Sequence, residues 1–110
     1  AGQVLTRPSS TAFTAVASVH RTMNERRQRL DHPAADASLK CECECRRVEC
    51  GSGFNVNLER YEDVRAHARR FVVAHGHENP GESIISSTPD YLVIEKVGTE
   101  GNTAEALNPR

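Results

Sequence analysis

Hydrophobic and polar positions follow two different periods along this chain, and the longest periodic stretch comes first. Between residues 12 and 30, apolar or large side chains recur three and four positions apart, which predicts an amphipathic helix. The members of this stripe are Phe13, Val16, Ala17, His20, Met23, Arg27 and Leu30. Because the stripe is narrow and its second half is polar, we expect the helix to lie on a surface or to pair with a partner.

A period of two dominates the second half of the chain. Phe54, Val56 and Leu58 alternate with polar residues and predict a half-buried strand. Asn57 is a suitable N-cap for a helix over residues 58–69. Further strands are predicted at residues 71–75, 82–87 and 91–97, with a hairpin turn at Thr88-Pro89-Asp90 between the last two.

These elements predict an α+β fold, with a small, mostly antiparallel sheet and a metal knuckle, preceded by one amphipathic helix. Pro33 cannot continue the first helix and indicates a linker after it. Both ends of the chain are polar and aperiodic. The expected divisions are a disordered tail (1–11), the helix (12–30), the linker (31–38), a metal-stabilised domain (39–98) and a second tail (99–110).

Composition indicates that such a domain needs a cross-link besides its hydrophobic core. The chain has 110 residues, 37% hydrophobic residues and no Trp, so its core is small and a metal or disulfides would stabilise it. The formal net charge of −1 argues against general binding to nucleic acid or to a membrane surface. With no apolar run of about 18 residues and no secretory signal, we expect a cytoplasmic protein with reduced thiols. In a secreted protein, the four cysteines would instead form two disulfides.

All four cysteines fall between residues 41 and 50. Packing does not explain this crowding, because a buried cysteine behaves as a small hydrophobe and needs no sulfur neighbour, whereas a soft cation attracts several thiolates. A tetrahedral zinc site needs a fourth donor besides three thiolates, and His77 follows a glycine that lets the backbone approach closely. The favoured ligands are Cys43, Cys45, Cys50 and His77, with Cys41 and His75 as alternates.

The donor set also indicates which metal to expect. Three thiolates and an imidazole suit Zn²⁺, with Fe or Cu(I) as alternatives, and a filled site of this kind has a structural role. If His77 is not a ligand, an exchangeable fourth position would permit metal-dependent catalysis with Glu78 as general base, or soft-metal sensing or buffering.

Several short motifs occur together over about residues 23–110. They are Asn24-Glu25-Arg26, Cys43-Glu44-Cys45 with Cys50, Tyr61-Glu62-Asp63-Val64-Arg65, Phe71-Val72-Val73, Gly76-His77-Glu78, Tyr91-Leu92-Val93-Ile94-Glu95-Lys96 and Asn108-Pro109-Arg110. In this combination the chain resembles a family of small, uncharacterised cytoplasmic proteins from actinobacteria. The resemblance implies Cys43, Cys45, Cys50 and His77 as ligands and implies no activity. The chain departs from the family pattern at Cys41, where a hydrophobic residue is usual, and at His75, where proline is usual.

The favoured function is a non-catalytic, zinc-stabilised binding or regulatory module that acts through another protein. Nucleic-acid binding is an alternative, because the first helix carries Arg21, Arg26, Arg27 and Arg29, although a solvated basic face explains these residues more simply. No membrane partner is expected. The apolar stripe of the same helix makes a homodimer a further alternative.

Overall fold

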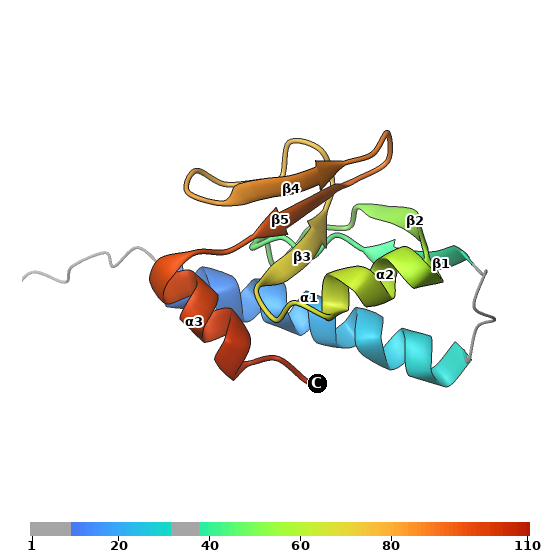
Figure 1. The fold of residues 1–110 in the computed structure, drawn as a ribbon, viewed down its shortest axis with the longest axis horizontal. Helices are drawn as coiled ribbons and strands as arrows, with labels where there is room; N and C mark the ends of the chain where they lie inside the picture. The colour runs from blue at the N-terminus through green and yellow to red at the C-terminus, as the bar shows by residue number, and fades with distance from the viewer. Residues whose placement is uncertain (1–9, 32–37) are drawn as a thin grey trace, which may run out of the picture.

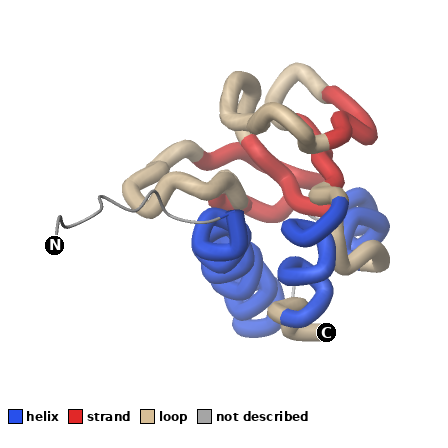
Figure 2. The backbone as a smooth tube through the Cα atoms, turned by 90° about the vertical axis from the view of Figure 1, so that its left-hand side faces the viewer, coloured by secondary structure: helices blue, strands red, loops and turns tan. Residues whose placement is uncertain are grey.

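The computed structural model describes residues 10–31 and 38–110, which form an α+β fold and confirm the predicted class. In chain order the elements are α1 (Ser10–Asp31), β1 (Ser38–Glu42), β2 (Gly53–Asn57), α2 (Leu58–Arg65), β3 (Arg70–Val73), β4 (Ser83–Ser87), β5 (Leu92–Glu95) and α3 (Gly98–Ala106). Helices α1 and α3 pack against each other beneath the strands (Figures 1 and 2). None of the described helices is long and apolar enough to cross a membrane. The predictions for residues 1–9 and 32–37 lie outside the described residues.

Helix α1 covers the predicted helix, but it buries a more polar face than the stripe indicates. Its buried side chains are Thr14, Ala17, Ser18, Arg21, Asn24 and Glu25. Met23, a member of the predicted stripe, is 48% exposed. Val19, on the same helix, is 59% exposed. Of the stripe, only Ala17 is among the buried side chains described, because the helix is held by hydrogen bonds and ion pairs of polar side chains as well as by apolar contact.

Strands β1 and β2 form an antiparallel hairpin in which Cys41 lies opposite Phe54. Phe54 and Val56 are buried and alternate with exposed residues, which confirms the prediction for this strand. Strand β1 was not predicted, because Cys41 was weighed as a metal ligand and not as an apolar residue. In the structure Leu39 and Cys41 are the buried, alternating positions of β1.

The second sheet has the strand order β3-β5-β4, and both of its strand pairs are antiparallel. The predicted hairpin is confirmed, since the Thr88 N–H donates to the Tyr91 carbonyl at 2.9 Å. Asn57 caps α2 as predicted, and its side chain accepts from the backbone N–H groups of the first turn. The Tyr91 ring stacks on Phe54, with centroids 5.3 Å apart, so the two sheets share one core.

Helix α3 corrects the prediction of a polar tail after residue 98. It contains few apolar side chains, and only Gly101 and Ala104 are buried. A Cβ on Gly101 would lie 2.7 Å from the Lys96 carbonyl oxygen and 2.3 Å from the Arg69 guanidinium, so glycine permits the helix to pack this closely. The Ala104 carbonyl accepts from Arg21 Nη2 at 2.8 Å, which joins α3 to α1.

Candidate metal centre

The loop between β1 and β2, residues 43–52, carries three of the four cysteines and is called the knuckle loop below. The Cys43 N–H donates to the Ser52 carbonyl at 2.9 Å, which brings the two ends of the loop together. Within the loop, the Cys50 N–H donates to the Arg47 carbonyl at 3.2 Å. These bonds fold the loop so that Cys43, Cys45 and Cys50 lie near one another.

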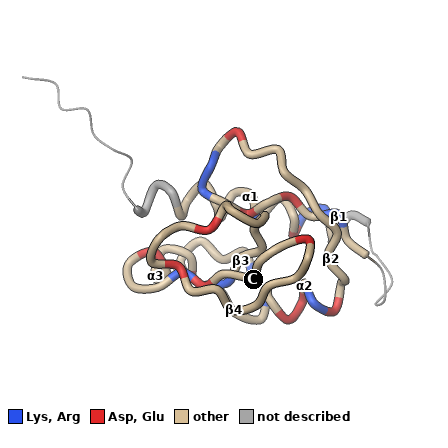
Figure 3. Tube along the Cα trace, turned by 90° about the horizontal axis from the view of Figure 1, so that it is seen from above, with Lys and Arg blue, Asp and Glu red and all other residues tan. Residues whose placement is uncertain are grey.

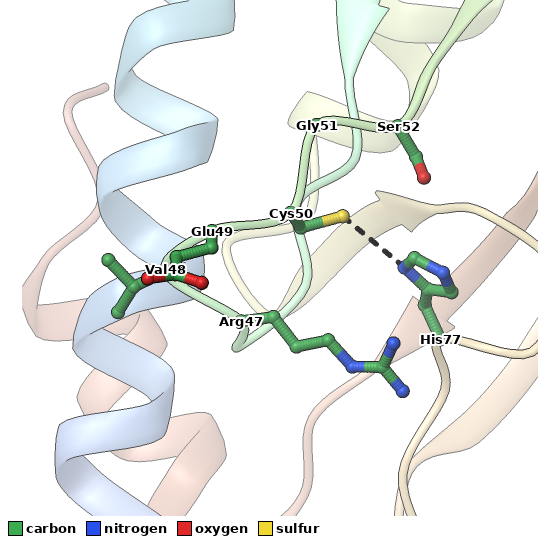
Figure 4. Close-up of a pocket in the computed structure, with 7 residues that line it drawn as sticks. All are labelled: Arg47, Val48, Glu49, Cys50, Gly51, Ser52 and His77. Carbon is green, nitrogen blue, oxygen red and sulfur yellow. Dashed lines mark hydrogen bonds between the residues drawn. The ribbon is translucent and has the colours of Figure 1, made fainter.

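The fourth side chain comes from the turn after β3. The His77 N–H donates to the Ala74 carbonyl at 3.0 Å, and the intervening Gly76 has a φ of 83°, a conformation that favours glycine. This turn directs the His77 ring toward the sulfur of Cys50 (Figure 4). His77 Nδ1 lies 3.4 Å from Cys50 Sγ and 3.4 Å from Cys43 Sγ.

The geometry of this group fits a metal ion. The donor atoms of Cys43, Cys45, Cys50 and His77 all lie within 4.8 Å of one another. Zinc–sulfur and zinc–nitrogen bonds of about 2.3 and 2.0 Å place tetrahedral donors about 3.6 Å apart, close to the distances observed. This Cys3His group could therefore hold a metal ion. That these four residues are the ligands stays a prediction.

The electrostatics of the group favour a cation. Burial raises the pKa of the Cys43 and Cys45 thiols. At Cys50 burial also acts to raise the pKa, but hydrogen bonds with Ser52, Cys45 and Cys43 together outweigh it and lower the pKa. A bound cation would supply the positive charge that buried thiolates need. The Ala74 N–H also donates to Cys43 Sγ at 3.1 Å, as outer hydrogen bonds do around metal-bound thiolates.

Glu44 separates two candidate ligands and faces away from them into the protein. Its side chain is fully buried. Its carboxylate accepts from Asn24 Nδ2 at 2.8 Å and from the Val72 N–H at 3.0 Å. Burial raises its pKa to about 7, although both hydrogen bonds act in the opposite direction. Because Glu44 faces away from the two cysteines, its hydrogen bonds with Asn24 and Val72 link the candidate metal centre to α1 and β3.

Neither alternate ligand belongs to the group. Cys41 is buried in β1, and burial raises the pKa of its thiol to about 12. His75 is exposed, and its Nε2 lies 2.5 Å from the Thr88 carbonyl oxygen. His20, a member of the predicted helix stripe, directs its Nε2 to the Arg47 carbonyl at 3.1 Å and so joins α1 to the knuckle loop.

The candidate general base is adjacent in sequence to one of the candidate ligands in the metal group. Glu78 follows His77, and its Oε1 is buried with no hydrogen-bond partner among the described residues. Arg47 extends along the open side of the same group, whereas Val48 and Glu49 point away from the sulfur (Figure 4). The positive charge of Arg47 would offset part of the negative charge of three thiolates.

The four arginines of α1 do not form one basic surface. Arg21 is fully buried, with its guanidinium 4.3 Å from the centroid of the Phe71 ring, so it cannot contact nucleic acid. Arg27 pairs with Glu42 at 3.4 Å, and only Arg26 and Arg29 are exposed and without a recorded ion pair in the described part of the chain. Basic and acidic residues also alternate along the described part of the trace (Figure 3).

A second cluster, which we call the ion-pair network, was not predicted. Buried Arg65 pairs with buried Glu25, and Arg110 reaches the same Glu25 at 2.7 Å. Arg110 also binds both carboxylate oxygens of Glu62, at 2.7 and 2.9 Å. Asn108 accepts from Arg65, so the network joins α1, α2 and the residues after α3. The sequence separations of these pairs, between 40 and 85 residues, explain why no local pattern indicates them.

No family model, curated protein or solved structure matches this chain. Its function is therefore inferred from the arrangement of its own residues.

Proposed function

We propose that this chain is a small interaction module whose fold is stabilised by a structural zinc ion, bound by Cys43, Cys45, Cys50 and His77. The observation that supports it most directly is the convergence of these four donors within 4.8 Å. Membership in the actinobacterial family with the same motifs is part of this proposal, and so is a protein as the partner.

The chemistry of the donors supports both the metal and its role. Three thiolates and an imidazole favour zinc over harder cations, and Fe or Cu(I) are the competing metals. Four protein donors complete a tetrahedral shell and leave no position for water or substrate, which is typical of structural zinc.

The position of the group supports a stabilising role as well. It connects the knuckle loop to the turn after β3, and therefore connects the β1–β2 hairpin to the second sheet. The Glu44 N–H donates to the Val72 carbonyl at 2.8 Å beside it, so the backbone bonds and the metal would hold the same junction. Removal of the metal is expected to separate the hairpin from the second sheet.

Exposed apolar side chains support a protein as the partner. Val19 and Met23 on α1 form a groove with Leu107, and all three side chains are more than two-fifths exposed. Apolar surface of this kind is characteristic of protein interaction sites. The charges on Arg26 and Arg29 at the end of α1 would complement an acidic partner.

A second candidate is a metal-dependent enzyme with Glu78 as its general base. The unpaired, buried Oε1 of Glu78 next to His77 favours it. This function requires a metal position open to water, so His77 would have to leave the metal. A metal bound by four protein side chains in every molecule would rule it out.

Elemental analysis and native mass spectrometry of protein purified without added metal test the proposal. We expect one zinc ion per chain in the wild type, loss of that zinc in His77→Ala, and retention of it in the control His75→Ala, whose ring lies outside the group. The mass of a metal-free protein containing two disulfides would overturn the proposal. Zinc bound equally by both variants would exclude His77 as the fourth ligand and leave catalysis as the better candidate.

A further inference from the structure

The three thiols of the metal group differ in their access to solvent. Cys43 and Cys45 are buried, with 0% and 3% of their surface exposed, whereas Cys50 is partly exposed. Cys50 lines an open pocket of about 610 Å³ together with Arg47 and His77 (Figure 4). Oxidation of a cysteine follows its thiolate character and its exposure. Among these three sulfurs, a small oxidant in solution therefore reaches Cys50 first.

A second thiol lies close enough to react with an oxidised Cys50. The sulfur of Cys50 lies within 4.8 Å of those of Cys45 and Cys43. Cys43 Sγ accepts from the Ala74 N–H at 3.1 Å, which ties it to the turn after β3. Cys45 and Cys50 flank a turn of the knuckle loop, in which the Cys50 N–H donates to the Arg47 carbonyl at 3.2 Å. Cys45 can therefore approach Cys50 to the disulfide distance of about 2.05 Å without breaking the bond to Ala74.

We propose that Cys50 and Cys45 are a peroxide-sensitive thiol pair, and that their oxidation to a disulfide empties the metal site. The proposal rests on the proposed function, because it takes the zinc-bound form as the starting state and adds a condition under which the module loses its metal. Cysteine binds a metal as the thiolate, which is also its reactive form toward oxidants.

The reaction uses one molecule of hydrogen peroxide for each disulfide. The Cys50 thiolate attacks one peroxide oxygen, the O–O bond breaks, and Cys50 sulfenic acid and hydroxide are formed. The Cys45 thiolate then attacks the sulfur of this sulfenic acid, so that the S–S bond forms and the S–O bond breaks to release a second hydroxide. The two thiolates supply the two electrons that reduce the peroxide, and two protons from solvent convert both hydroxides to water.

Oxidation of this pair removes two of the four proposed donors. Cys43 and His77 remain, and they complete only half of the tetrahedral shell that a structural zinc site needs. The junction between the β1–β2 hairpin and the second sheet then depends on backbone bonds, such as that from the Glu44 N–H to the Val72 carbonyl at 2.8 Å. We expect the oxidised protein to unfold at a lower temperature than the zinc-loaded protein, and reduction in the presence of zinc to restore the difference.

Peroxide titration of the full zinc-loaded chain tests this proposal. Zinc release is followed with a chromophoric chelator, and disulfides are located by mass spectrometry after proteolysis. Cleavage after Glu42, Glu44 and Glu49 places each of the four cysteines on its own fragment. We expect zinc release and a Cys45–Cys50 disulfide to appear together. A disulfide that contains Cys41 or Cys43, or oxidation to sulfinic acid without any disulfide, overturns the proposal.

A variant separates the exposed thiol from metal binding. Cys50→His keeps four donors, since two thiolates and two imidazoles also form a structural zinc site. We expect it to release zinc at least about tenfold more slowly than the wild type at the same peroxide concentration. The control is Cys41→Ala, which changes a buried thiol outside the group and should leave the rate as in the wild type. Equal rates in the wild type and Cys50→His overturn the proposal, and if Cys50→His binds no zinc, the disulfide map of the wild type decides alone.

The metal content before peroxide is added separates this proposal from the proposed function. A chain that contains no zinc but forms the Cys45–Cys50 disulfide would reject structural zinc and support the thiol pair. A zinc-loaded chain that keeps its zinc and four free thiols in excess peroxide would reject the thiol pair alone. A chain that neither contains zinc nor forms this disulfide would reject both.

Discussion

The knuckle loop and the ion-pair network join distant parts of the chain in opposite ways. The knuckle loop places three donors within eight residues and adds one histidine from the turn after β3. The network has no local motif, and its carboxylates and arginines meet only when α1, α2 and the chain after α3 have packed. The first group could hold a cation, whereas the second has its charges paired by the protein itself.

Removing one carboxylate from the ion-pair network is expected to cause the largest loss of unfolding free energy. Glu25→Ala leaves Arg65 buried without its partner and removes one contact of Arg110. Breaking a buried pair in this way costs about 3–5 kcal/mol of unfolding free energy, measured by denaturant titration. Zinc content should stay at one ion per chain, because Glu25 does not touch the metal group.

The matched control for this change is Glu105→Ala. Its pair with Arg69 is 2.6 Å long, but the Glu105 side chain is 53% exposed, and such pairs contribute about 0–1 kcal/mol. Equal effects of the two substitutions would show that burial does not distinguish the network from ordinary surface pairs. Loss of zinc in Glu25→Ala would show that the ion-pair network and the knuckle loop are coupled.

Asn24 lies on α1, the helix that contacts both the ion-pair network and the knuckle loop. Removing its side chain tests whether the two regions are independent. Its side chain accepts from the Glu42 N–H at 2.8 Å and donates to the Glu42 carbonyl at 2.9 Å and to Glu44. Asn24→Ala leaves these partly buried groups unpaired, which costs about 1–3 kcal/mol. It should also weaken zinc binding in competition with a chromophoric chelator, because Glu44 lies between two of the proposed ligands. Asn55→Ala, on the exposed face of β2, is the control and should change neither quantity.

The smallest expected effect depends on pH. The hydrogen bonds from Arg110 lower the pKa of Glu62, so this contact stabilises the fold above the unfolded-state pKa of about 4.3 and is lost as the pH falls through the folded-state value. Because both side chains are about one-third exposed or more, Arg110→Ala should cost roughly 1 kcal/mol or less at pH 7 through this pair. The difference from the wild type in thermal unfolding should shrink in acid. An equal difference at every pH would assign the effect of Arg110 to packing.

The difference between contacts among neighbouring residues and contacts between distant ones explains how much of the fold the sequence could predict. The helix with its Asn57 cap, the alternation of Phe54 and Val56 and the turn at Thr88 each depend on neighbouring residues, and the structure confirms them. Strand β1 and helix α3 were missed for related reasons. The apolar positions of β1 include a cysteine that was assigned to metal chemistry, and α3 is packed through small residues that give no apolar stripe.

For the site, the sequence indicated which side chains lie together and not what surrounds them. Crowding of the cysteines and the flexibility of Gly76 led to the favoured set of Cys43, Cys45, Cys50 and His77, whose donor atoms lie together in the structure, and their role as ligands stays a prediction. The burial of Glu44 could not be expected, because its partners at Asn24 and Val72 lie 20 and 28 residues away. Nor could the burial of Arg21, because its partners at Ala68 and Ala104 lie 47 and 83 residues away.

Gly101 places a limit on how this chain can vary. The residues of α3 look interchangeable in the sequence, and most of them face solvent. At Gly101, however, even a methyl group would meet the fixed carbonyl oxygen of Lys96, and no side-chain rotation relieves a contact with the backbone. Among natural variants of this protein, substitutions should therefore be common around this glycine and rare at it, so the least tolerant position of the C-terminal segment lacks a side chain altogether.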